Sequence, residues 1–367
     1  MSWCDAHRSS TSLRIRGRTS RPSSSRECRR SLDGVPSVGR PKWSGTEESS
    51  SETDDGAVWP QMGNAEIVGV ANPEAGNGRA RRYARRLDRV LRAGGLSSVI
   101  RFTSAPLDAI RLTREAIDSG AKTVLAIGGD GTVNEVINGF LQAGGSNVAQ
   151  LALAPVGTGT DFARTLGQGG DAGEVLARLQ RGRRRAIDLG FVDFTDLEGK
   201  RASRYFVNIA EFGSGGAVVD RVNRTTKILG GRMSFLLAIL STLPKYRNRI
   251  ARWRIDGGPW IEAVVNNFVV ANGRFFGGGL MPAPYAELDD GALDVVVIDD
   301  VDFKTVRHHL NDLRRGTHVG LKFVRYVRAR VVETEGTDGA LVDLDGELVG
   351  VDPTHFVCVP RAIDVLV

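Results

Sequence analysis

The sequence predicts an α/β domain followed by a β-rich domain, and three observations support that prediction. From Glu66 to about Arg185, apolar strand-like runs alternate with helix-like segments, which is typical of a parallel sheet covered on both faces. After Asp188, strand-like runs and turns replace this alternation. Glycine-bearing turns also follow three of the early strands. We therefore expect a three-layer, doubly wound α/β domain and then a β-sandwich domain.

The first 63 residues differ from the rest and form a predicted disordered tail. Residues 1–61 hold fourteen Ser and show no apolar period, so they cannot bury enough surface to offset the entropy of ordering. The Arg- and Ser-rich start resembles an organellar transit peptide. A mis-assigned translation start is the alternative, because Met62 stands just before the first strand.

The α/β domain is expected over residues 64–186. Apolar runs predict its strands near 66–72, 98–103, 122–127 and 149–155. Apolar positions at helical spacing predict its helices near 79–93, 107–119, 132–142 and 171–181.

The β-sandwich domain is expected over residues 187–351, with residues 352–367 returning to the α/β domain. Strand-like runs occupy 204–209, 251–255, 263–271, 293–298 and 326–332. The segment Asp256-Gly-Gly-Pro259 reads as a turn between two of them. The run Met233–Leu243 is too short to cross a membrane and predicts a buried or interfacial helix.

The most informative stretch is Val124–Val136, where an apolar strand runs into Gly128-Gly129-Asp130-Gly131 and then into a helix. Glycine permits positive φ and leaves no Cβ to block a ligand, and a helix N-terminus offers unpaired N–H groups. The turn therefore suits a phosphate. It matches neither the Walker pattern nor the dinucleotide fingerprint, so a tight connection without a ligand is the alternative.

The same device occurs twice more, at Asn72–Gly78 and at Val156–Asp161. Loops at the carboxyl ends of parallel strands meet at one edge of a sheet, so three such turns can converge on one ligand. Together they predict a nucleotide pocket.

Six motifs, in this order, resemble the signatures of lipid kinases with the diacylglycerol kinase catalytic domain, especially the soluble bacterial members related to sphingosine and ceramide kinases. The resemblance runs from about Ile67 to the C-terminus. It rests on Asn72-Pro73-x-x-Gly76, Gly128-Gly-Asp-Gly-Thr-Val-Asn-Glu135, Pro155-x-Gly-Thr-Gly-x-Asp-Phe-Ala-Arg164, Asn272-Gly-Arg-Phe-Phe-Gly-Gly-Gly279, Asp290-Gly-x-Leu-Asp294 and Asp345-Gly-Glu347. The family usually has Asn where this chain has Thr160.

The resemblance implies an ATP-dependent lipid kinase whose nucleotide lies in a cleft between an α/β nucleotide-binding domain and a β-sandwich lipid domain. It places the proton acceptor at Glu347, with Asp345 beside it. Taken alone, Asp345-Gly346 would be a hairpin turn. The implied nucleotide contacts are Asn72, Pro73, Gly76, Thr103, Gly128, Gly129, Asp130, Gly131, Thr132, Asn134 and Thr158. Thr103 is equally well explained as an N-cap or strand end.

Two metal sites are expected. Asp130, Asp161 and Asp188 flank strand ends and could bind Mg²⁺ together with ATP. Separately, Glu287–Ala292 resembles the family's structural metal loop, in which the Asp290 carboxylate is joined by the carbonyls of Glu287 and Ala292. A solvated acidic loop is the alternative.

Composition limits the partners. Three scattered cysteines fit neither a disulfide framework nor a zinc site, and the five histidines show no metal spacing. The basic and aromatic run Lys245–Arg254 could dock on an anionic membrane, whereas no nucleic-acid motif accompanies the net charge of +6. We expect a cytoplasmic, peripherally membrane-associated enzyme without a transmembrane segment, and a homodimer is possible.

Diacylglycerol is the simplest acceptor, with a sphingosine-type lipid as an alternative. A NAD kinase would share Gly128–Thr132 but has no need of the helix 233–243 or of Asp345-Gly-Glu347. A nucleotide-binding regulator without catalysis is the third possibility.

Overall fold

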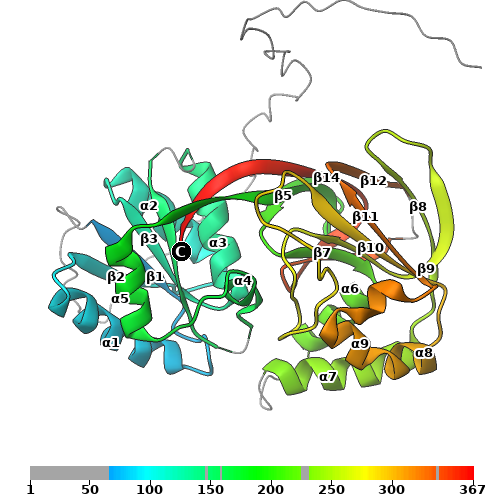
Figure 1. Cartoon of the computed structure of the whole chain (residues 1–367), viewed down its shortest axis with the longest axis horizontal. Helices are drawn as coiled ribbons and strands as arrows, with labels where there is room; N and C mark the ends of the chain where they lie inside the picture. The colour runs from blue at the N-terminus through cyan, green and yellow to red at the C-terminus, as the bar shows by residue number, and fades with distance from the viewer. Residues whose placement is uncertain (1–65, 145–147, 158, 225–230, 336–338) are drawn as a thin grey trace, which may run out of the picture. The chain divides into compact units, whose positions relative to one another are not determined.

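The computed structural model describes residues 66–144, 148–157, 159–224, 231–335 and 339–367, and side chains are not described for 223–236 or 353 (Figure 1). These described residues all belong to one compact unit of the chain. The predicted tail lies outside them.

The α/β domain contains a parallel sheet in the order β4-β3-β1-β2. Its strands are β1 (Ile67–Ala71), β2 (Ser98–Phe102), β3 (Thr123–Gly128) and β4 (Gln150–Pro155). Its helices are α1 (Arg79–Ala93), α2 (Asp108–Asp118), α3 (Asp130–Gln142), α4 (Asp161–Thr165) and α5 (Ala172–Arg181). All four predicted strands and four predicted helices are present, with α4 in addition.

Helices cover both faces of this sheet. Val68 and Val70 of β1 pack with α2 and α3, whereas Ile67 and Ala71 pack with α1 and α5 on the opposite face. Alternate residues of one strand thus serve two separate cores, which explains why the strand is apolar throughout. The three-layer prediction is confirmed.

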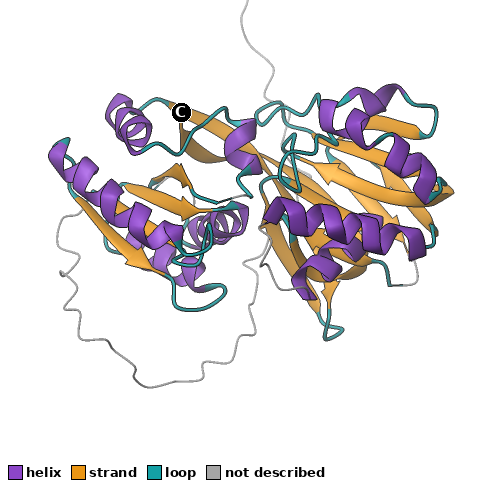
Figure 2. Ribbon diagram, turned by 90° about the horizontal axis from the view of Figure 1, so that it is seen from below, coloured by secondary structure: helices purple, strands orange, loops and turns teal. Residues whose placement is uncertain are grey.

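The second domain is an antiparallel β-sandwich with two pairs of helices inserted (Figure 2). Its strands are β5 (Arg184–Asp196), β6 (Arg201–Phe206), β7 (Ile209–Gly213), β8 (Arg249–Ile255), β9 (Ile261–Ala271), β10 (Leu293–Asp299), β11 (Val324–Ala329), β12 (Val331–Glu335), β13 (Leu341–Leu344) and β14 (Glu347–Leu366). Its helices are α6 (Ser214–Arg224), α7 (Gly231–Thr242), η3 (Leu243–Lys245), α8 (Phe303–His308), α9 (Leu310–Arg315) and η4 (Thr317–Gly320). Its core contains Phe206, Phe212, Trp253, Phe268 and Phe356.

One strand connects the two domains. β14 pairs with β13, β12 and β5 in the sandwich, and near its end Val365 pairs with Leu151 of β4. Ile363 and Val365 are buried in the α/β core. The chain therefore returns to its first domain along the strand that begins at Glu347.

Sequence and structure differ where a strand-like run contains a break. The run 204–209 is divided between β6 and β7, because Val207 and Asn208 donate their N–H groups to Asp345 instead of to a neighbouring strand. The run 326–332 is similarly divided at Arg330, whose N–H donates to Asp256. Helices α8 and α9 were not predicted, since each spans only six residues.

Candidate active site

Loops from both domains surround one cavity of about 640 Å³. The α/β domain contributes the three glycine-bearing loops after β1, β3 and β4. The sandwich domain contributes α6, the loop after β9 and the β13–β14 turn. The lining residues are Asn72, Glu74, Ala75, Gly76, Asn77, Gly129, Asp130, Gly131, Thr132, Glu135, Val156, Gly157, Gly159, Asp161, Asn208, Ile209, Val219, Val222, Phe276, Gly277, Gly278, Asp343, Asp345, Gly346 and Glu347.

The second and third glycine loops are bound to each other by backbone hydrogen bonds. The Asp130 N–H donates to the Gly159 carbonyl over 2.9 Å, and the Asp130 carboxylate accepts the N–H groups of Asp161 and Phe162. Burial, followed by the nearby Asp161 carboxylate, raises the pKa of Asp130 to about 6. Asp130 therefore ties the two loops together.

The first loop reaches the third at two glycines that lie close together. Gly76 and Gly157 both have positive φ, and a Cβ added to either would lie 3.3–3.4 Å from the other's backbone. Only glycine combines this conformation with such a close approach. The convergence predicted for the three turns is thus present as direct contact between their backbones.

The N-terminus of α3 opens into this cavity. Gly129 precedes the helix, and Gly131 and Thr132 of its first turn line the cavity. N–H groups in the first turn have no acceptor within a helix, and the helix dipole favours negative charge there. A phosphate group of a nucleotide suits this position.

Glu347 faces the same helix turn from the sandwich side. A Cβ added to Gly131 would lie 3.3 Å from Glu347 Oε1. The other oxygen of Glu347 is paired with the Arg204 guanidinium at 2.8 Å. Arg204 is buried and also donates to the side-chain oxygen of Asn134 on α3. These contacts fix the carboxylate beside the first turn of α3.

Asp345 has a different environment from Glu347. Its carboxylate accepts the N–H groups of Val207, Asn208 and Ile209 at 2.9 Å, and the Asn134 amide at 2.8 Å. Burial raises the pKa of Asp345 to about 6. With four donors bound, Asp345 organises the β6–β7 connection, and the catalytic role expected for it beside Glu347 stays a prediction.

Of the twelve expected catalytic and nucleotide-contact residues that the structure describes, eight line the cavity and four do not. Those that line it are Asn72, Gly76, Gly129, Asp130, Gly131, Thr132, Asp345 and Glu347. Pro73, Thr103, Gly128 and Asn134 lie outside the lining, and Thr158 lies outside the described residues. Thr103 directly follows the last residue of β2, and its N–H donates to the Ala71 carbonyl. This position agrees with the alternative that Thr103 marks a strand end.

Asp188 does not join Asp130 and Asp161, contrary to our expectation. It is fully buried, and its oxygens accept the N–H groups of Gly291 and Arg361. Asp188 therefore supports the loop around residue 291 and a positive-φ turn in β14. Asp161, by contrast, lines the cavity, accepts the Gly278 N–H and pairs with Arg164.

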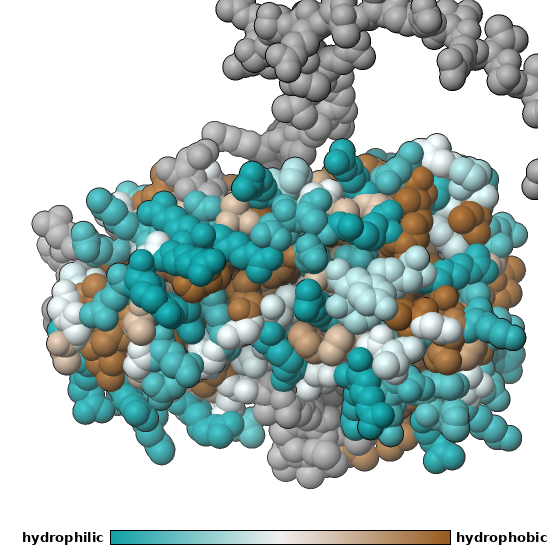
Figure 3. Space-filling view, in the orientation of Figure 1, coloured by the Kyte–Doolittle hydropathy of each residue, from teal (hydrophilic) through white to brown (hydrophobic). Residues whose placement is uncertain are grey.

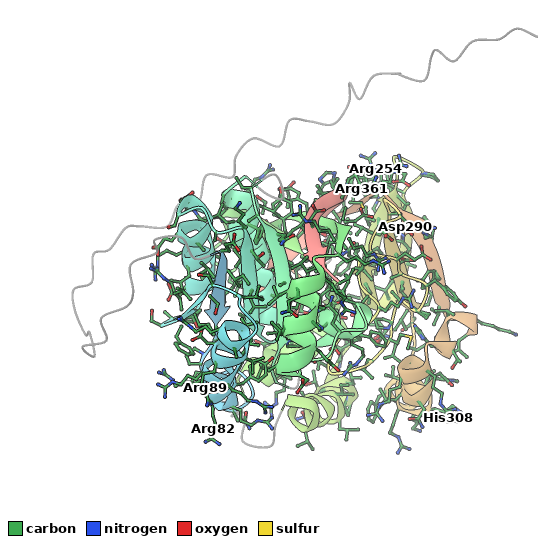
Figure 4. All side chains as sticks on the ribbon, turned by 60° about the vertical axis from the view of Figure 1, so that its left-hand side comes forward. Arg82, Arg89, Arg254, Asp290, His308 and Arg361 are labelled. Atoms are coloured by element: carbon green, nitrogen blue, oxygen red, sulfur yellow. The ribbon has the colours of Figure 1, made fainter. Side chains whose placement is uncertain are left out.

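In the expected structural metal loop, an arginine side chain of the protein itself occupies the place expected for the metal ion. Asp290 pairs with the Arg328 guanidinium and also accepts the Ala292 N–H, while Glu287 is exposed. Figure 4 shows Asp290 in the sandwich domain. In this arrangement a metal ion would have to displace Arg328, so the donor set does not fit one. Across the described residues, no three His, Cys, Asp or Glu side chains gather as a metal site.

Sequence reasoning missed several lining residues. Gly277 and Gly278 lie in a motif that had been quoted for the resemblance but not assigned to the site. Glu135, whose carboxylate accepts the Ala109 N–H, follows the predicted glycine turn directly. Arg204 had no signal, because a lone arginine in a strand carries no pattern. In the part of the chain that the structure describes, no helix is both long and apolar enough to span a membrane.

Comparison with known proteins assigns this chain to a family. Residues 66–192 match the diacylglycerol kinase catalytic domain, and residues 208–367 match the YegS C-terminal NAD kinase beta sandwich-like domain. The first match corresponds to the α/β domain described above and the second to most of the β-sandwich domain. The chain belongs to this diacylglycerol kinase-like and YegS-like family.

Individual relatives agree with that assignment. A probable lipid kinase YegS-like from Pseudomonas aeruginosa is 33% identical over 276 residues, which cover 75% of this chain and 86% of the relative. A diacylglycerol kinase from Bacillus subtilis is 27% identical over 298 residues, which cover 81% and 94%. A solved structure of a diacylglycerol kinase from Bacillus anthracis shares the fold, with a TM-score of 0.61, 20% identity, and coverage of 82% of this chain and 96% of that chain.

Proposed function

We propose that this protein is an ATP-dependent lipid kinase that transfers the γ-phosphate to a lipid hydroxyl, in the simplest case that of diacylglycerol to give phosphatidic acid. One observation carries the proposal: the Glu347 carboxylate lies against the first turn of α3, at Gly131, in the cavity that the glycine loops line. A general base and a phosphate cradle therefore share one space.

The chain's own residues divide the work of phosphoryl transfer. The glycine loops and the N-terminus of α3 hold the polyphosphate by close backbone approach. Glu347 accepts the proton of the attacking hydroxyl, and Arg204 holds its carboxylate in place. The Glu347 side chain is 37% exposed, so a substrate hydroxyl can reach it.

A divalent metal is expected to enter with ATP. The carboxylates of Asp130 and Asp161 line the cavity beside the glycine loops, and these would lie nearest to Mg²⁺ bound to the polyphosphate. The metal would neutralise phosphate charge during transfer. The expected second site, at Asp290, forms no part of the proposal because Arg328 occupies that carboxylate.

The lining beyond the glycine loops supports a lipid acceptor. Val219 and Val222 of α6, Ile209 of β7 and Phe276 are apolar and line the same cavity. Burying alkyl groups against such side chains stabilises binding by about 25 cal/mol per Å². An acceptor with hydrocarbon next to its hydroxyl matches this surface better than a dinucleotide does.

We also propose that the protein works at the cytoplasmic surface of a membrane, docked by the β8–β9 hairpin. Ile250 and Val264 are exposed and directly opposite each other on these strands. Nearby, Arg252 and Arg254 stack on Trp260. Figure 4 shows Arg254 at the periphery of the sandwich, and on the face in Figure 3 hydrophobic side chains are interspersed with hydrophilic ones. Arg252 pairs with Glu335 and Arg254 with Glu333, so anionic headgroups, which stabilise a nearby cation by about 1 kcal/mol, would compete with these carboxylates.

Radiolabelled ATP supplied with diacylglycerol, sphingosine or NAD tests the proposed function. We expect label in the diacylglycerol product, with Glu347→Gln as the matched inactive control. Transfer of the label to sphingosine or to NAD would instead identify that molecule as the acceptor. No transfer to any of the three, with ATP binding intact, would instead favour a regulator without catalysis.

A further inference from the structure

A pair of carboxyl groups lies buried behind the catalytic turn. Glu211 on β7 and Asp343 on β13 are direct partners in the antiparallel pairing of these strands. Cross-strand partners have Cβ atoms about 4.5–5.5 Å apart, on the same face of the sheet. Glu211 is 0% and Asp343 3% exposed, although Asp343 reaches the edge of the cavity.

Each member of the pair has one oxygen without a hydrogen-bond partner. These are Glu211 Oε1 and Asp343 Oδ1, and both are buried. The Asn267 amide donates to the second oxygen of Glu211, and the Gly346 N–H lies near the Asp343 carboxylate. A buried acceptor left unpaired is costly, and two ionised carboxylates at this separation repel strongly. One proton between the two free oxygens would satisfy both.

Among the residues that the structure describes, the groups recorded next to the pair are an amide, backbone groups and further carboxylates. Asn267 from β9 and the start of α6 face Glu211, whereas Asp345, Gly346 and Glu347 face Asp343. Burial raises the pKa of Glu211 to about 7, and burial followed by the nearby Glu211 carboxylate raises the pKa of Asp343 well above its ordinary range.

The surroundings leave little room for a metal ion in place of the proton. Gly215, in the first turn of α6, lies so close that an added Cβ would be 2.1–2.3 Å from the Glu211 carboxylate. Mg²⁺ requires about six oxygen ligands and usually keeps several waters. A proton requires no such space.

The pair is joined to the catalytic turn by short connections. Asp343 lies two residues before Asp345, and its carboxylate lies near the N–H of Gly346, the residue immediately before Glu347. On the facing strand, the Ile209 carbonyl accepts the Asp345 N–H at 2.8 Å. Any separation of β7 from β13 would therefore move Glu347.

We propose that Glu211 and Asp343 share a single proton, and that the protonated pair is a positioning element that keeps Glu347 beside the phosphate loops. The positioning part rests on the proposed kinase function, whereas the shared proton does not. Loss of the proton places a second negative charge behind the turn and pushes the two strands apart.

Urea unfolding between pH 5 and pH 8 tests the shared proton without any activity assay. A carboxyl whose pKa is raised on folding binds more protons in the native state, so stability is full below the ordinary value of 4.5 and falls as pH rises toward about 7. We expect the unfolding equilibrium constant of the wild type to rise with pH more steeply than that of Glu211→Gln, by up to tenfold per pH unit. The exposed Glu198→Gln should follow the wild type.

Kinetics test the positioning role. In the wild type kcat should fall above about pH 7, and Glu211→Gln should move that alkaline limb up by more than one pH unit. Asp343→Ala should lower kcat at least tenfold with little change in the KM for ATP. Asp343→Asn, which keeps an acceptor for Gly346 and offers a donor to Glu211, should recover most of that loss.

The two readouts separate the ways in which the proposal can fail. Equal pH slopes in wild type and Glu211→Gln would overturn the shared proton, even if Glu347→Gln still slows transfer and the kinase assignment stands. The positioning role would be overturned if the kcat of wild type and that of Glu211→Gln fell at the same alkaline pH. It would also be overturned if Asp343→Asn were as slow as Asp343→Ala. A protein that phosphorylates no lipid would refute the kinase function and with it the positioning role, while the unfolding data would still decide the proton.

Discussion

Glu347 depends on two neighbours of opposite character. Arg204 pairs with one of its oxygens from a buried position, whereas Gly131 leaves open space at the other. A charged partner on one side restricts the rotamers of the carboxylate, and the missing side chain on the other admits a substrate. The base is therefore held in place and accessible at the same time.

Replacing Glu347 with glutamine should separate catalysis from binding. The amide keeps the shape of the side chain but cannot take up the hydroxyl proton, so turnover should fall by about 10²–10⁴. ATP affinity should change little, because the group acts on the attacking oxygen. Single-turnover transfer and calorimetry with ATP check the two quantities. Unchanged turnover would move the base elsewhere, with the cavity-lining Asp130 next to be tested.

Two glycines of the same loop should respond differently to alanine. At Gly129 an added Cβ would lie 2.6 Å from the Gly159 carbonyl oxygen, so Gly129→Ala, like Gly129→Val, should force the loops apart and lower the melting temperature. At Gly131 the neighbour is the end of the Glu347 side chain, 3.3 Å away, and no backbone atom. Gly131→Ala should keep its melting temperature and lose turnover, and equal melting of both variants would contradict this account.

The role of a residue could not be predicted where it depends on partners that are far away in the sequence. The glycine turns were recognisable because strand, turn and helix follow one another within a short segment. Arg204 and Asn134 meet only when β6 packs against α3. Asn134 belongs to a quoted motif, but Arg204 carries no local pattern, so their contact could not be foreseen. Asp345 was recognised as part of a motif, but its four donors come from α3 and from the segment after β6.

At the scale of elements, Asp345 substitutes for a strand partner at the β6–β7 connection. Its carboxylate binds three consecutive N–H groups that neither strand satisfies. Asp345 itself has positive φ, which a non-glycine residue rarely adopts. The turn before β14 and the break between β6 and β7 thus stabilise each other.

Removing the Asp345 carboxylate should therefore lower the stability of the fold more than it lowers turnover. Asp345→Ala leaves three N–H groups without an acceptor, and we expect the free energy of unfolding to fall by roughly 2–4 kcal/mol. Asp345→Asn keeps one acceptor oxygen and should lose less. Urea unfolding of both variants measures the difference. A loss of turnover with wild-type stability would support the catalytic role expected for Asp345.

The sequence predicted the order of elements better than their ends. Apolar runs located all four strands of the α/β domain, because burial on both faces demands them, but in the sandwich domain they did not reveal β5 or β13. The runs did not show where a strand breaks, because the N–H groups of Val207 and Arg330 donate to side chains that are far away in the sequence instead of to a neighbouring strand. α8 and α9 are too short for an apolar period to emerge.

For the molecule as a whole, the first 61 residues should be dispensable. They lie outside the described residues, and their composition offers no apolar face to pack on either domain. A chain that starts at Met62 should keep the melting temperature and turnover of the full chain, as measured by differential scanning fluorimetry and the transfer assay. A clear fall in either value would show that the tail contributes to the fold or the site.

β14 also determines when this protein can become active during its synthesis. β4 emerges from the ribosome early, but its partner around Val365 is made only after the whole sandwich domain. Until then the nascent α/β domain has an open sheet edge, of the kind that chaperones cover and that aggregates recruit. The strand that closes this edge begins with Glu347. Completion of the α/β domain and arrival of the proposed catalytic carboxylate therefore depend on the same strand.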